Sequence, residues 1–284
     1  MFMNATTASN APLVAGFIGL GDQGLPMARA VAEAGFSLTA WARRPASLEP
    51  LAGVPHQVAD SVEELAASCD VVALCVGTDE DVERLVTQML PHLREGAIVA
   101  NHGTGVPATA VRLTERGAPH QVAVLDAPVS GGRPAAEEKR LTCMAGGPDA
   151  AFERCRPVFE AFSAHVVHLG HAGAGQTAKL FNNALLMLNQ RSVADIVALA
   201  AQLDVDLDAL VDVLELGSAS SAALSLLNTM VRPDNVDHLS AVEALDMELF
   251  EQAMSDAGVE AGDVTERGLS GARGLPALLT RLNS

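Results

Sequence analysis

The sequence is short of positive charge. Its 284 residues include 18 Lys and Arg against 35 Asp and Glu, which gives a formal net charge of −17. A surface this acidic repels polyphosphate backbones, so the composition argues against nucleic-acid binding. Lysine is scarcer still, because Lys139 and Lys179 are the only lysines and every other basic residue is Arg.

The chain also lacks export and membrane signals. No apolar run approaches the roughly 20 residues that span a bilayer, and residues 1–12 contain neither Lys, Arg nor the apolar centre of a signal peptide. The cysteines, Cys69, Cys75, Cys143 and Cys155, show neither CxxC spacing nor a disulfide framework. We therefore expect a cytoplasmic protein without membrane contact or metal, with residues 1–12 as a flexible N-terminus.

Up to Gly175 the sequence alternates strand patterns with helix patterns. Short β-branched runs separated by helical patterns are typical of βαβ units on a parallel sheet. The predicted strands are residues 13–19, 37–41, 71–76, 97–101, 122–126, 141–145 and 166–168. The predicted helices among them are residues 26–34, 62–67 and 79–90.

Beyond Gly175 the strand patterns stop and helical patterns replace them. Residues 176–202 have apolar side chains at helical spacing and neither Gly nor Pro, which predicts a helix about 40 Å long at 1.5 Å per residue. The glycine-rich residues 170–175 before it are the best candidate for a domain boundary. We expect an α/β domain over residues 13–174 and an all-α domain over residues 175–284, linked by the long helix.

A glycine-rich turn lies between the first predicted strand and the first predicted helix. GxGxxG spacing permits a tight turn, lets the backbone approach a pyrophosphate and lets helix and strand pack closely, while the helix N-terminus offers unpaired N–H groups to phosphates. The pattern predicts a Rossmann-type, doubly wound, mostly parallel sheet that binds a dinucleotide; the alternative is an ordinary turn without a ligand. The expected contacts are Gly19, Leu20, Gly21, Asp22, Gln23 and Gly24.

The end of the second predicted strand indicates which dinucleotide binds. An NAD-dependent enzyme places Asp or Glu there to bind the ribose 2′-hydroxyl, but this chain has Arg43 and Arg44. Guanidinium groups are permanently charged and suit bidentate contact with a 2′-phosphate. We therefore expect NADP(H) to be preferred, with NAD(H) as the second choice. In the competing interpretation the two arginines are solvated loop charges.

Three segments resemble the β-hydroxyacid dehydrogenases, a family that includes 3-hydroxyisobutyrate dehydrogenases and semialdehyde reductases. Residues 16–28 are similar to the family's opening, residues 126–132 to its substrate-binding motif and residues 170–183 to its catalytic motif. Because the three segments lie in the expected order and spacing, the resemblance covers nearly the whole chain. It implies an NAD(P)-binding domain followed by a helical domain similar to that of 6-phosphogluconate dehydrogenases.

The resemblance assigns roles to five residues. It implies that Ser130, Gly131 and Gly132 hold the acid group of a small anionic substrate, for which a hydroxyl and successive glycine N–H groups form a small nest. Lys179 is the implied catalytic acid/base, a role that Lys fills when desolvation lowers its pKa and that Arg cannot fill. Asn183, four residues later on the same helix face, is implied to orient the substrate and the lysine.

The chain departs from the family at three places, one of which is the more charged loop of residues 133–140; the other two concern expected site residues. Leu245 stands where the family often has a lysine that reaches the nicotinamide end of the cofactor, which leaves Asp246 beside it as a candidate contact. His102 stands in a segment where the family commonly has Asp and small hydroxyl residues. We expect His102 to reach the substrate, although a lone His is more often a hydrogen-bonded loop residue. The remaining expected cofactor contacts are Val76, Gly77 and Thr104.

Together these features predict hydride exchange between NADP(H) and a small 3-hydroxy acid or its semialdehyde, with Lys179 exchanging the proton. Two alternatives stay open. One is an imine reductase on the same scaffold, which Lys179 disfavours because an ammonium repels an iminium. The other is a cofactor-binding regulator without turnover. The resemblance and the helical domain also suggest a homodimer or homotetramer.

Overall fold

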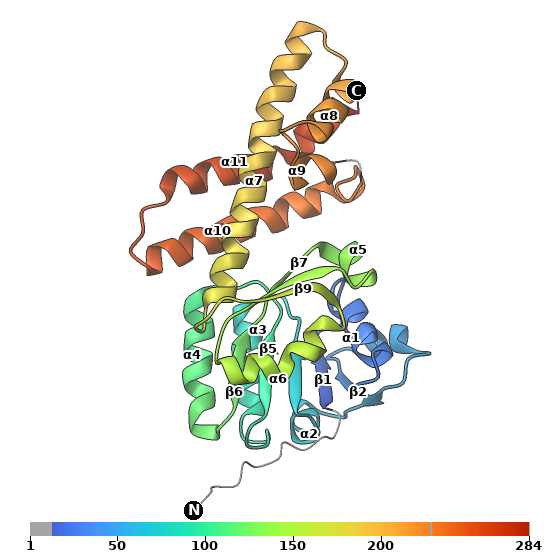
Figure 1. Ribbon diagram of the computed structural model, residues 1–284, viewed down its shortest axis with the longest axis vertical. Helices are drawn as coiled ribbons and strands as arrows, with labels where there is room; N and C mark the ends of the chain where they lie inside the picture. The colour runs from blue at the N-terminus through green and yellow to red at the C-terminus, as the bar shows by residue number, and fades with distance from the viewer. Residues whose placement is uncertain (1–12, 228, 284) are drawn as a thin grey trace, which may run out of the picture. The chain divides into compact units, whose positions relative to one another are not determined.

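The computed structural model describes residues 13–227 and 229–283. These residues fall into two compact units (Figure 1). The α/β unit comprises residues 13–103 and 111–172, and the helical unit comprises residues 104–110 and the described residues from 173 onward. The chain therefore contributes a short segment to the helical unit before it returns to the α/β unit.

The α/β unit is built on a six-stranded parallel sheet. Its strand order is β3-β2-β1-β4-β5-β6. The strands are β1 (Val14–Ile18), β2 (Ser37–Trp41), β3 (Gln57–Val58), β4 (Val71–Leu74), β5 (Ile98–Asn101) and β6 (Ala123–Asp126). The order reverses between β1 and β4, and ligands of such sheets bind beyond the carboxyl ends of the strands at this switch point. The prediction of a doubly wound parallel sheet is confirmed.

Three further strands form a second, smaller sheet in the same unit. It contains β7 (Val129–Ser130), β8 (Leu141–Ala145) and β9 (Ser163–His168). Strand β7 pairs antiparallel with β8, and β8 pairs parallel with β9. The sequence patterns predicted strands at β8 and β9 but not their separate sheet, because apolar alternation does not specify a strand's partner.

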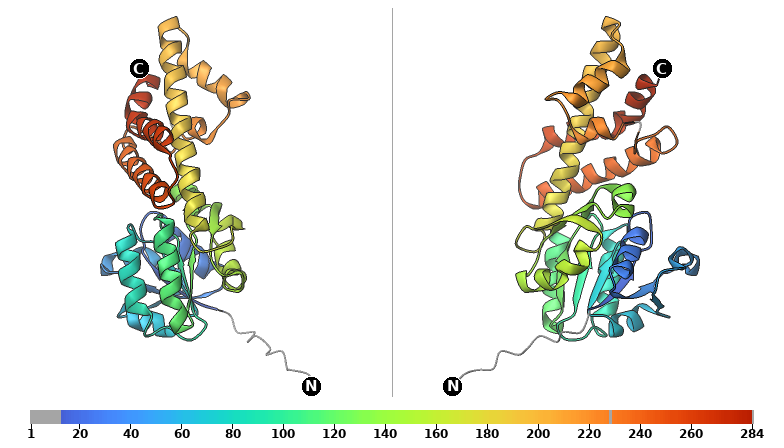
Figure 2. Two further views of the ribbon diagram at one scale, coloured as in Figure 1. Left: turned by 90° about the vertical axis from the view of Figure 1, so that its left-hand side faces the viewer. Right: turned by 45° about the vertical axis from the view of Figure 1, so that its right-hand side comes forward.

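Helices cover both faces of the large sheet (Figure 2). They are α1 (Gly24–Glu33), α2 (Val62–Ser68), α3 (Asp79–Met89), α4 (Pro107–Gly117), α5 (Gly132–Glu137) and α6 (Asp149–Glu160). One buried core contains Met27 of α1 and Phe152 of α6, and the other contains Leu65, Leu85 and Leu113 of α2, α3 and α4. Two continuous cores fix the sheet between its helices and so position the strand ends.

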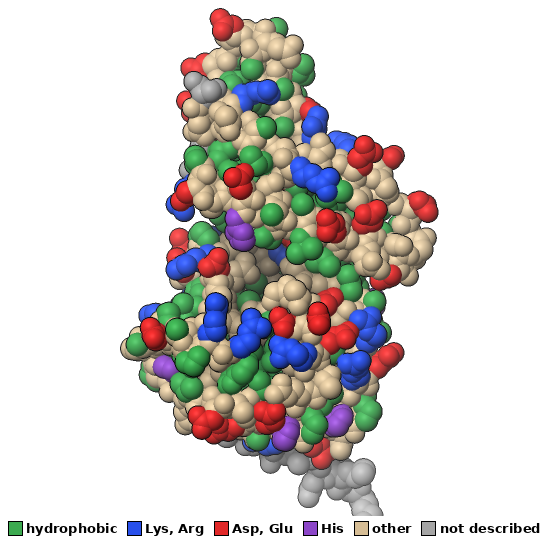
Figure 3. Space-filling view, turned by 180° about the vertical axis from the view of Figure 1, so that it is seen from behind, with side chains coloured by type: hydrophobic (Ala, Val, Ile, Leu, Met, Phe, Trp, Pro, Cys, Tyr) green, Lys and Arg blue, Asp and Glu red, His purple; other side chains and the backbone are tan. Residues whose placement is uncertain are grey.

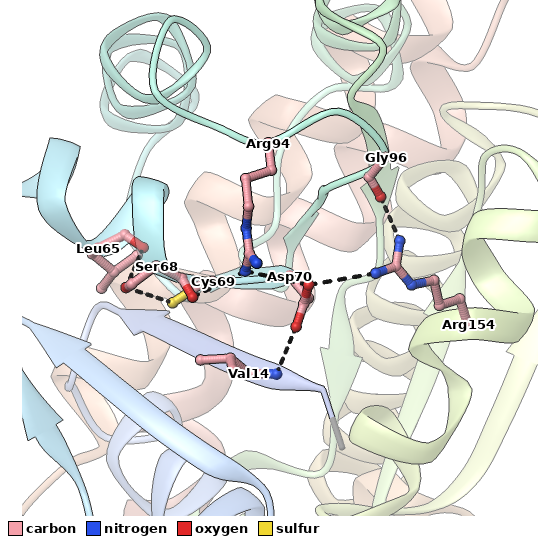
Figure 4. A network of polar contacts seen from close by, with 8 residues as sticks. All are labelled: Val14, Leu65, Ser68, Cys69, Asp70, Arg94, Gly96 and Arg154. Carbon is pink, nitrogen blue, oxygen red and sulfur yellow. Dashed lines mark hydrogen bonds and ion pairs between the residues drawn. The ribbon is translucent and has the colours of Figure 1, made fainter. Parts of the chain in front are cut away.

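A carboxylate network joins three elements at the amino end of the sheet (Figure 4). Asp70 Oδ2 accepts a hydrogen bond from Val14 N at 2.9 Å, and Oδ1 lies 3.3 Å from Arg94 Nη2 and 3.6 Å from Arg154 Nη2. Arg154 also donates to Gly96 O at 2.5 Å. The network connects the start of β1, the segment before β5 and helix α6 at the edge opposite the carboxyl ends of the strands.

The helical unit is organised around helix α7 (Ala174–Ala200), which has 27 residues. It is followed by α8 (Leu207–Leu216), α9 (Ala222–Ser225), α10 (Val236–Asp256) and α11 (Gly262–Leu282). Leu180 and Met187 of α7 share a core with Met247 and Phe250 of α10. Helix α11 packs closely against α7 at Gly271, where a Cβ would lie 2.0 Å from Met187 O.

Helix α7 overturns one expectation about membrane spans. Among the described residues, the stretch Ala174–Leu203 is long and apolar enough to cross a membrane by length and composition alone, with a mean hydropathy of 1.3 in its best window. The expectation that no apolar run approaches this length is therefore wrong. Isolated polar residues such as Asn183 and Gln190 interrupt the run, and both are buried within the unit. A long core helix passes the same test, so the expected lack of membrane contact stays a prediction.

Candidate active site

The glycine turn follows β1 and leads into α1. Gly19 has φ +98°, and a Cβ there would lie 2.1 Å from Cys75 O, while a Cβ at Gly24 would lie 1.9 Å from Gly19 O. The protein itself therefore requires glycine at these two positions. A Cβ at Gly21 would meet no atom of the described chain within 4 Å. Packing within the protein does not require glycine at position 21. A glycine there instead leaves room for a pyrophosphate to approach the backbone closely.

A hollow of about 760 Å³, including the open space at its mouth, lies beside this turn. Ends of β1, β2 and β4 contribute to its wall. The structure brings seven of the predicted cofactor contacts together in its lining: Gly19, Leu20, Gly21, Arg43, Arg44, Val76 and Gly77. A cavity that joins the glycine turn to two arginines has the groups that a phosphorylated dinucleotide needs.

The same lining includes residues that sequence reasoning missed, notably Ser47 and Arg84. Arg84 Nη2 donates to Asp81 Oδ1 at 2.6 Å, one turn into helix α3. The acidic start of α3 predicted a helix N-terminus, but no local pattern shows that α3 borders the same hollow as β2. Figure 3 shows basic side chains gathered on one face of the α/β unit, although the chain as a whole is acidic.

Three predicted members of the turn do not line the hollow: Gly24, which packs against Gly19 O, and Asp22 and Gln23. Asp22 is mostly exposed, and its Oδ1 lies 3.8 Å from Arg133 Nη1. Gln23 is the N-cap residue of α1, but its side chain makes no capping hydrogen bond. Their place in the turn agrees with the GxGxxG spacing, whereas their side chains are not among the groups that form the cavity.

Ser130, Gly131 and Gly132 form the turn from β7 into α5. Gly131 has φ +128° and Gly132 has φ +66°, both in the region that favours glycine. A Cβ at Gly131 would lie 2.5 Å from Ala135 Cβ. The backbone therefore requires Gly131 whether or not an anion binds, and the substrate role of the three residues stays a prediction.

His102 does not lie where we expected it. His102 is only 2% exposed, its Nδ1 lies 2.8 Å from Ala127 O, and its ring is nearly perpendicular to those of Phe159 and Phe162, at centroid distances of 5.2 and 5.3 Å. Burial lowers the pKa of His102 to about 4, so the ring is neutral. His102 N donates to Leu74 O and so extends the sheet beyond β5. This continuation turns the side chain into the core and away from solvent.

The helical unit brings together three predicted site residues. Asn183 Nδ2 on α7 donates to Asp246 Oδ2 on α10 at 2.7 Å. Burial lowers the pKa of Lys179, and the negative charge of Asp246 opposes this effect. Burial raises the pKa of Asp246, and Lys179 and Asn183 oppose that rise. Asp246 is thus an internal partner of the Lys179 and Asn183 side chains, whereas the neighbouring Leu245 is half exposed.

Thr104 belongs to the short segment of the helical unit, residues 104–110, which includes the start of α4. Next to it, Gly105 N donates to Gln176 Oε1 at 2.9 Å. A second polar pair was not predicted: Gln190 Nε2 donates to Glu243 Oε1 at 2.9 Å, and burial raises the pKa of Glu243 to about 7. The sequence did contain one signal for this pair: Glu243 lies three residues before Asp246, which places both on one face of a helix. Among the described residues, no cluster of three or more His, Cys, Asp or Glu side chains is placed to hold a metal ion.

A parallel sheet with a glycine turn at its switch point defines the class of dinucleotide-binding proteins, and known proteins define the family. Residues 14–170 match the family model of the NAD-binding domain of 6-phosphogluconate dehydrogenase. Residues 173–266 match the family model described as NAD-binding of NADP-dependent 3-hydroxyisobutyrate dehydrogenase. The two matches follow each other along the chain and cover most of it.

Characterised relatives support the same assignment. The NAD-dependent L-serine dehydrogenase of Pseudomonas aeruginosa is 33% identical over 75% of this chain and 72% of its own length. The 3-hydroxyisobutyrate dehydrogenase of the same organism is 33% identical with the same coverage. The structure of Mycobacterium tuberculosis 3-hydroxyisobutyrate dehydrogenase with L-serine has a TM-score of 0.86, with 27% identity, and covers 96% of this chain and all of that chain.

The chain therefore belongs to the 3-hydroxyisobutyrate dehydrogenase-like β-hydroxyacid dehydrogenase family. It is an NAD(P)-dependent dehydrogenase that acts on CH–OH groups. The resemblance seen in the three sequence motifs is confirmed.

Proposed function

We propose that this dehydrogenase acts on small 3-hydroxy acids, prefers NADP(H), and uses Lys179 to donate or accept the proton. The observation that carries the proposal is the cluster of Lys179, Asn183 and Asp246 within the helical unit. A bound nicotinamide dinucleotide supplies or accepts the hydride. The glycine turn and the hollow lined by Arg43 and Arg44 fit such a dinucleotide.

The environment of Lys179 suits proton transfer in both directions. Burial lowers the pKa of its ammonium group, which makes the neutral amine more accessible for oxidation of an alcohol. The charge of Asp246 limits the shift and so preserves the ammonium form needed for reduction of an aldehyde. Asn183 donates to Asp246 and accepts from Asn182 Nδ2 at 3.0 Å. We assign Asn183 as the residue that positions Asp246.

Replacement of Lys179 tests the central role. We expect Lys179→Ala to lower kcat by about 10²–10⁴-fold, while the Kd for NADPH measured by fluorescence titration changes little. The matched control is Lys139→Ala, because Lys139 forms an exposed ion pair with Glu33 at 2.9 Å. Near-normal turnover of the Lys179 variant would rule out the proposed acid/base role.

The substrate class follows from the relatives and from the turn at Ser130. The relatives are named for L-serine and 3-hydroxyisobutyrate, and one solved structure contains L-serine. We infer that Ser130 and the N–H groups of Gly131 and Gly132 hold the carboxylate of such a substrate. Turnover should be lost when the acid is replaced by its methyl ester, and Ser130→Ala should raise KM more than it lowers kcat. Activity with cyclic imines but not with semialdehydes would instead support an imine reductase.

The cofactor preference depends on the two arginines after β2. Charge-assisted hydrogen bonds contribute about 1.5–3 kcal/mol each, so we expect Arg43→Ala with Arg44→Ala to weaken NADPH binding at least about tenfold. NADH binding should change much less, because it has no 2′-phosphate. Arg140→Ala is the control, since Arg140 is exposed and paired with Glu138. Equal Kd values of the unmodified protein for NADPH and NADH would contradict the preference.

A further inference from the structure

Three buried oxygen atoms in the helical unit have no hydrogen-bond partner among the described residues; one is Thr265 Oγ1 on α11, and the other two belong to side chains that contact each other. These two are Glu243 Oε2 on α10 and Gln190 Oε1 on α7. The same two side chains are already joined, because Gln190 Nε2 donates to Glu243 Oε1 at 2.9 Å. Each residue therefore offers one satisfied atom and one unsatisfied acceptor. A single proton placed between Glu243 Oε2 and Gln190 Oε1 gives both atoms a hydrogen-bond partner.

We propose that Glu243 is protonated in the folded protein and that its Oε2–H donates to Gln190 Oε1, which completes a two-bond acid–amide pair between α10 and α7. A protonated carboxyl is a donor as well as an acceptor, whereas a carboxylate only accepts. An ionised Glu243 would leave both buried oxygens unsatisfied, which is strongly unfavourable. Turning the Gln190 amide over gives no better solution, because its oxygen would then face Glu243 Oε1.

The surrounding charges explain why the proton resides on Glu243. Glu243 and Asp246 are three residues apart on α10, so they share one face of the helix. Two neighbouring carboxylates in a poorly solvated site do not both ionise readily. Asp246 has the Asn183 amide at 2.7 Å and the charge of Lys179, whereas Glu243 has a neutral amide partner. The negative charge therefore belongs on Asp246.

Among the described residues, no basic side chain forms an ion pair with Glu243. On α7, Arg191 is held by Asp195, and its Nη1 donates to Ser270 Oγ of α11 at 3.0 Å. Burial and the charge of Asp246 both raise the pKa of Glu243, and the Gln190 hydrogen bond opposes them in part. A raised pKa favours the protonated form of Glu243, which is also the form that gives Glu243 Oε2 and Gln190 Oε1 a hydrogen-bond partner.

The acid–amide pair also affects the reaction, a role that rests on the proposed function of Lys179. With Glu243 neutral, Asp246 is the carboxylate among the described residues whose charge acts on the Lys179 ammonium. Loss of the Glu243 proton adds a second negative charge one helical turn from Asp246, which raises the pKa of Lys179. Glu243 is thus a positioning residue whose charge shifts the pH at which the lysine becomes neutral.

The first experiment detects the pair without any measurement of activity. Infrared spectra at neutral pH should contain a protonated-carboxyl C=O band that Glu243→Gln removes, while the control Glu248→Gln on the same helix retains it. Stability provides a second measurement. A carboxyl whose folded pKa is raised contributes stability that is present below pH 4.5 and is lost as the pH rises through about 7.

The free energy of unfolding of the unmodified protein should therefore fall, relative to that of Glu243→Gln, as the pH rises from 4.5 to about 7. Absence of the infrared band together with parallel pH–stability curves for the unmodified protein and Glu243→Gln would overturn the pair.

The second experiment tests the positioning role through the pH profile of alcohol oxidation. Glu243→Gln should move the rising limb of kcat/KM to lower pH by about half a unit or more, with plateau kcat changed less than about twofold. An unmoved limb, with the infrared band present, would overturn the positioning role. Near-normal turnover of Lys179→Ala would instead refute the proposed function and leave the acid–amide pair intact. The two failures are therefore distinguishable.

Discussion

Gly24 is the residue at which helix α1 and the glycine turn come closest. A Cβ there would lie 1.9 Å from Gly19 O, and Gly19 itself is held against Cys75 O of the neighbouring chain segment. Both contacts involve backbone, so neither can relax by a side-chain rotation. The turn and the helix start are therefore fixed by contact, before any ligand binds.

This contact separates a folding requirement from a binding requirement. We expect Gly24→Ala to lower the free energy of unfolding by about 2–4 kcal/mol, because an added methyl group has no space. Gly21→Ala should change it by less than about 0.5 kcal/mol and still weaken NADPH binding, because Gly21 meets no protein atom. Urea unfolding and NADPH titration of both variants provide the measurements. Equal stability losses would show that the two glycines have the same structural role.

His102 gives a pH-dependent contribution of opposite sign to that of Glu243. Its pKa is about 4 in the folded protein, against 6.5 for an unperturbed histidine, so its stabilising effect is present above pH 6.5 and is lost as the pH falls through about 4. The full loss is about 3 kcal/mol. His102→Gln should remove this loss in urea unfolding between pH 4 and 7, whereas His120→Gln, at an exposed position, should not. Unchanged pH dependence in the His102 variant would refute the assignment.

At the scale of elements, the sequence predicted those that a local pattern defines. Strands β1, β2 and β4 are buried apolar runs, and α7 lacks interior breakers, so its observed bounds differ from the predicted 176–202 by only two residues at each end. The helices α4 and α6 and the separate sheet of β7–β9 were not predicted. The Gln190–Glu243 pair was also missed, because it depends on how α7 packs against α10. Local periodicity predicts neither which sheet a strand joins nor which residues of two packed helices meet.

The Asp70 network is an element-scale feature whose contribution can be measured. Its arginines are about half exposed, so the ion pairs are weak, but the hydrogen bond to Val14 N anchors the start of β1. We expect Asp70→Ala to lower the free energy of unfolding by about 1–2 kcal/mol with little change in NADPH affinity. Asp60→Ala, at an exposed position, is the control. A large loss of NADPH affinity in the Asp70 variant would show that the network reaches the binding hollow.

At the scale of the whole molecule, the expected homodimer or homotetramer stays a prediction. Leu199 at the end of α7 is 58% exposed and Leu216 at the end of α8 is 90% exposed, so both side chains are available for contact with a partner subunit. Sedimentation velocity should show an assembly that Leu199→Glu with Leu216→Glu converts to a monomer, while Val58→Glu on the α/β unit does not. A monomer in the unmodified protein would contradict the expectation.

The short segment of residues 104–110 limits how this enzyme can exchange domains in evolution or engineering. It supplies the Gly105 N–H that binds the buried side chain of Gln176 and the Pro107 carbonyl against which Gly173 is packed. A chimera joined at a single crossover ahead of the long helix would replace these groups with those of a different parent. A transplanted C-terminal half would keep its native first turn only if the recipient also received residues 104–110, so a compatible hybrid needs two coordinated exchanges.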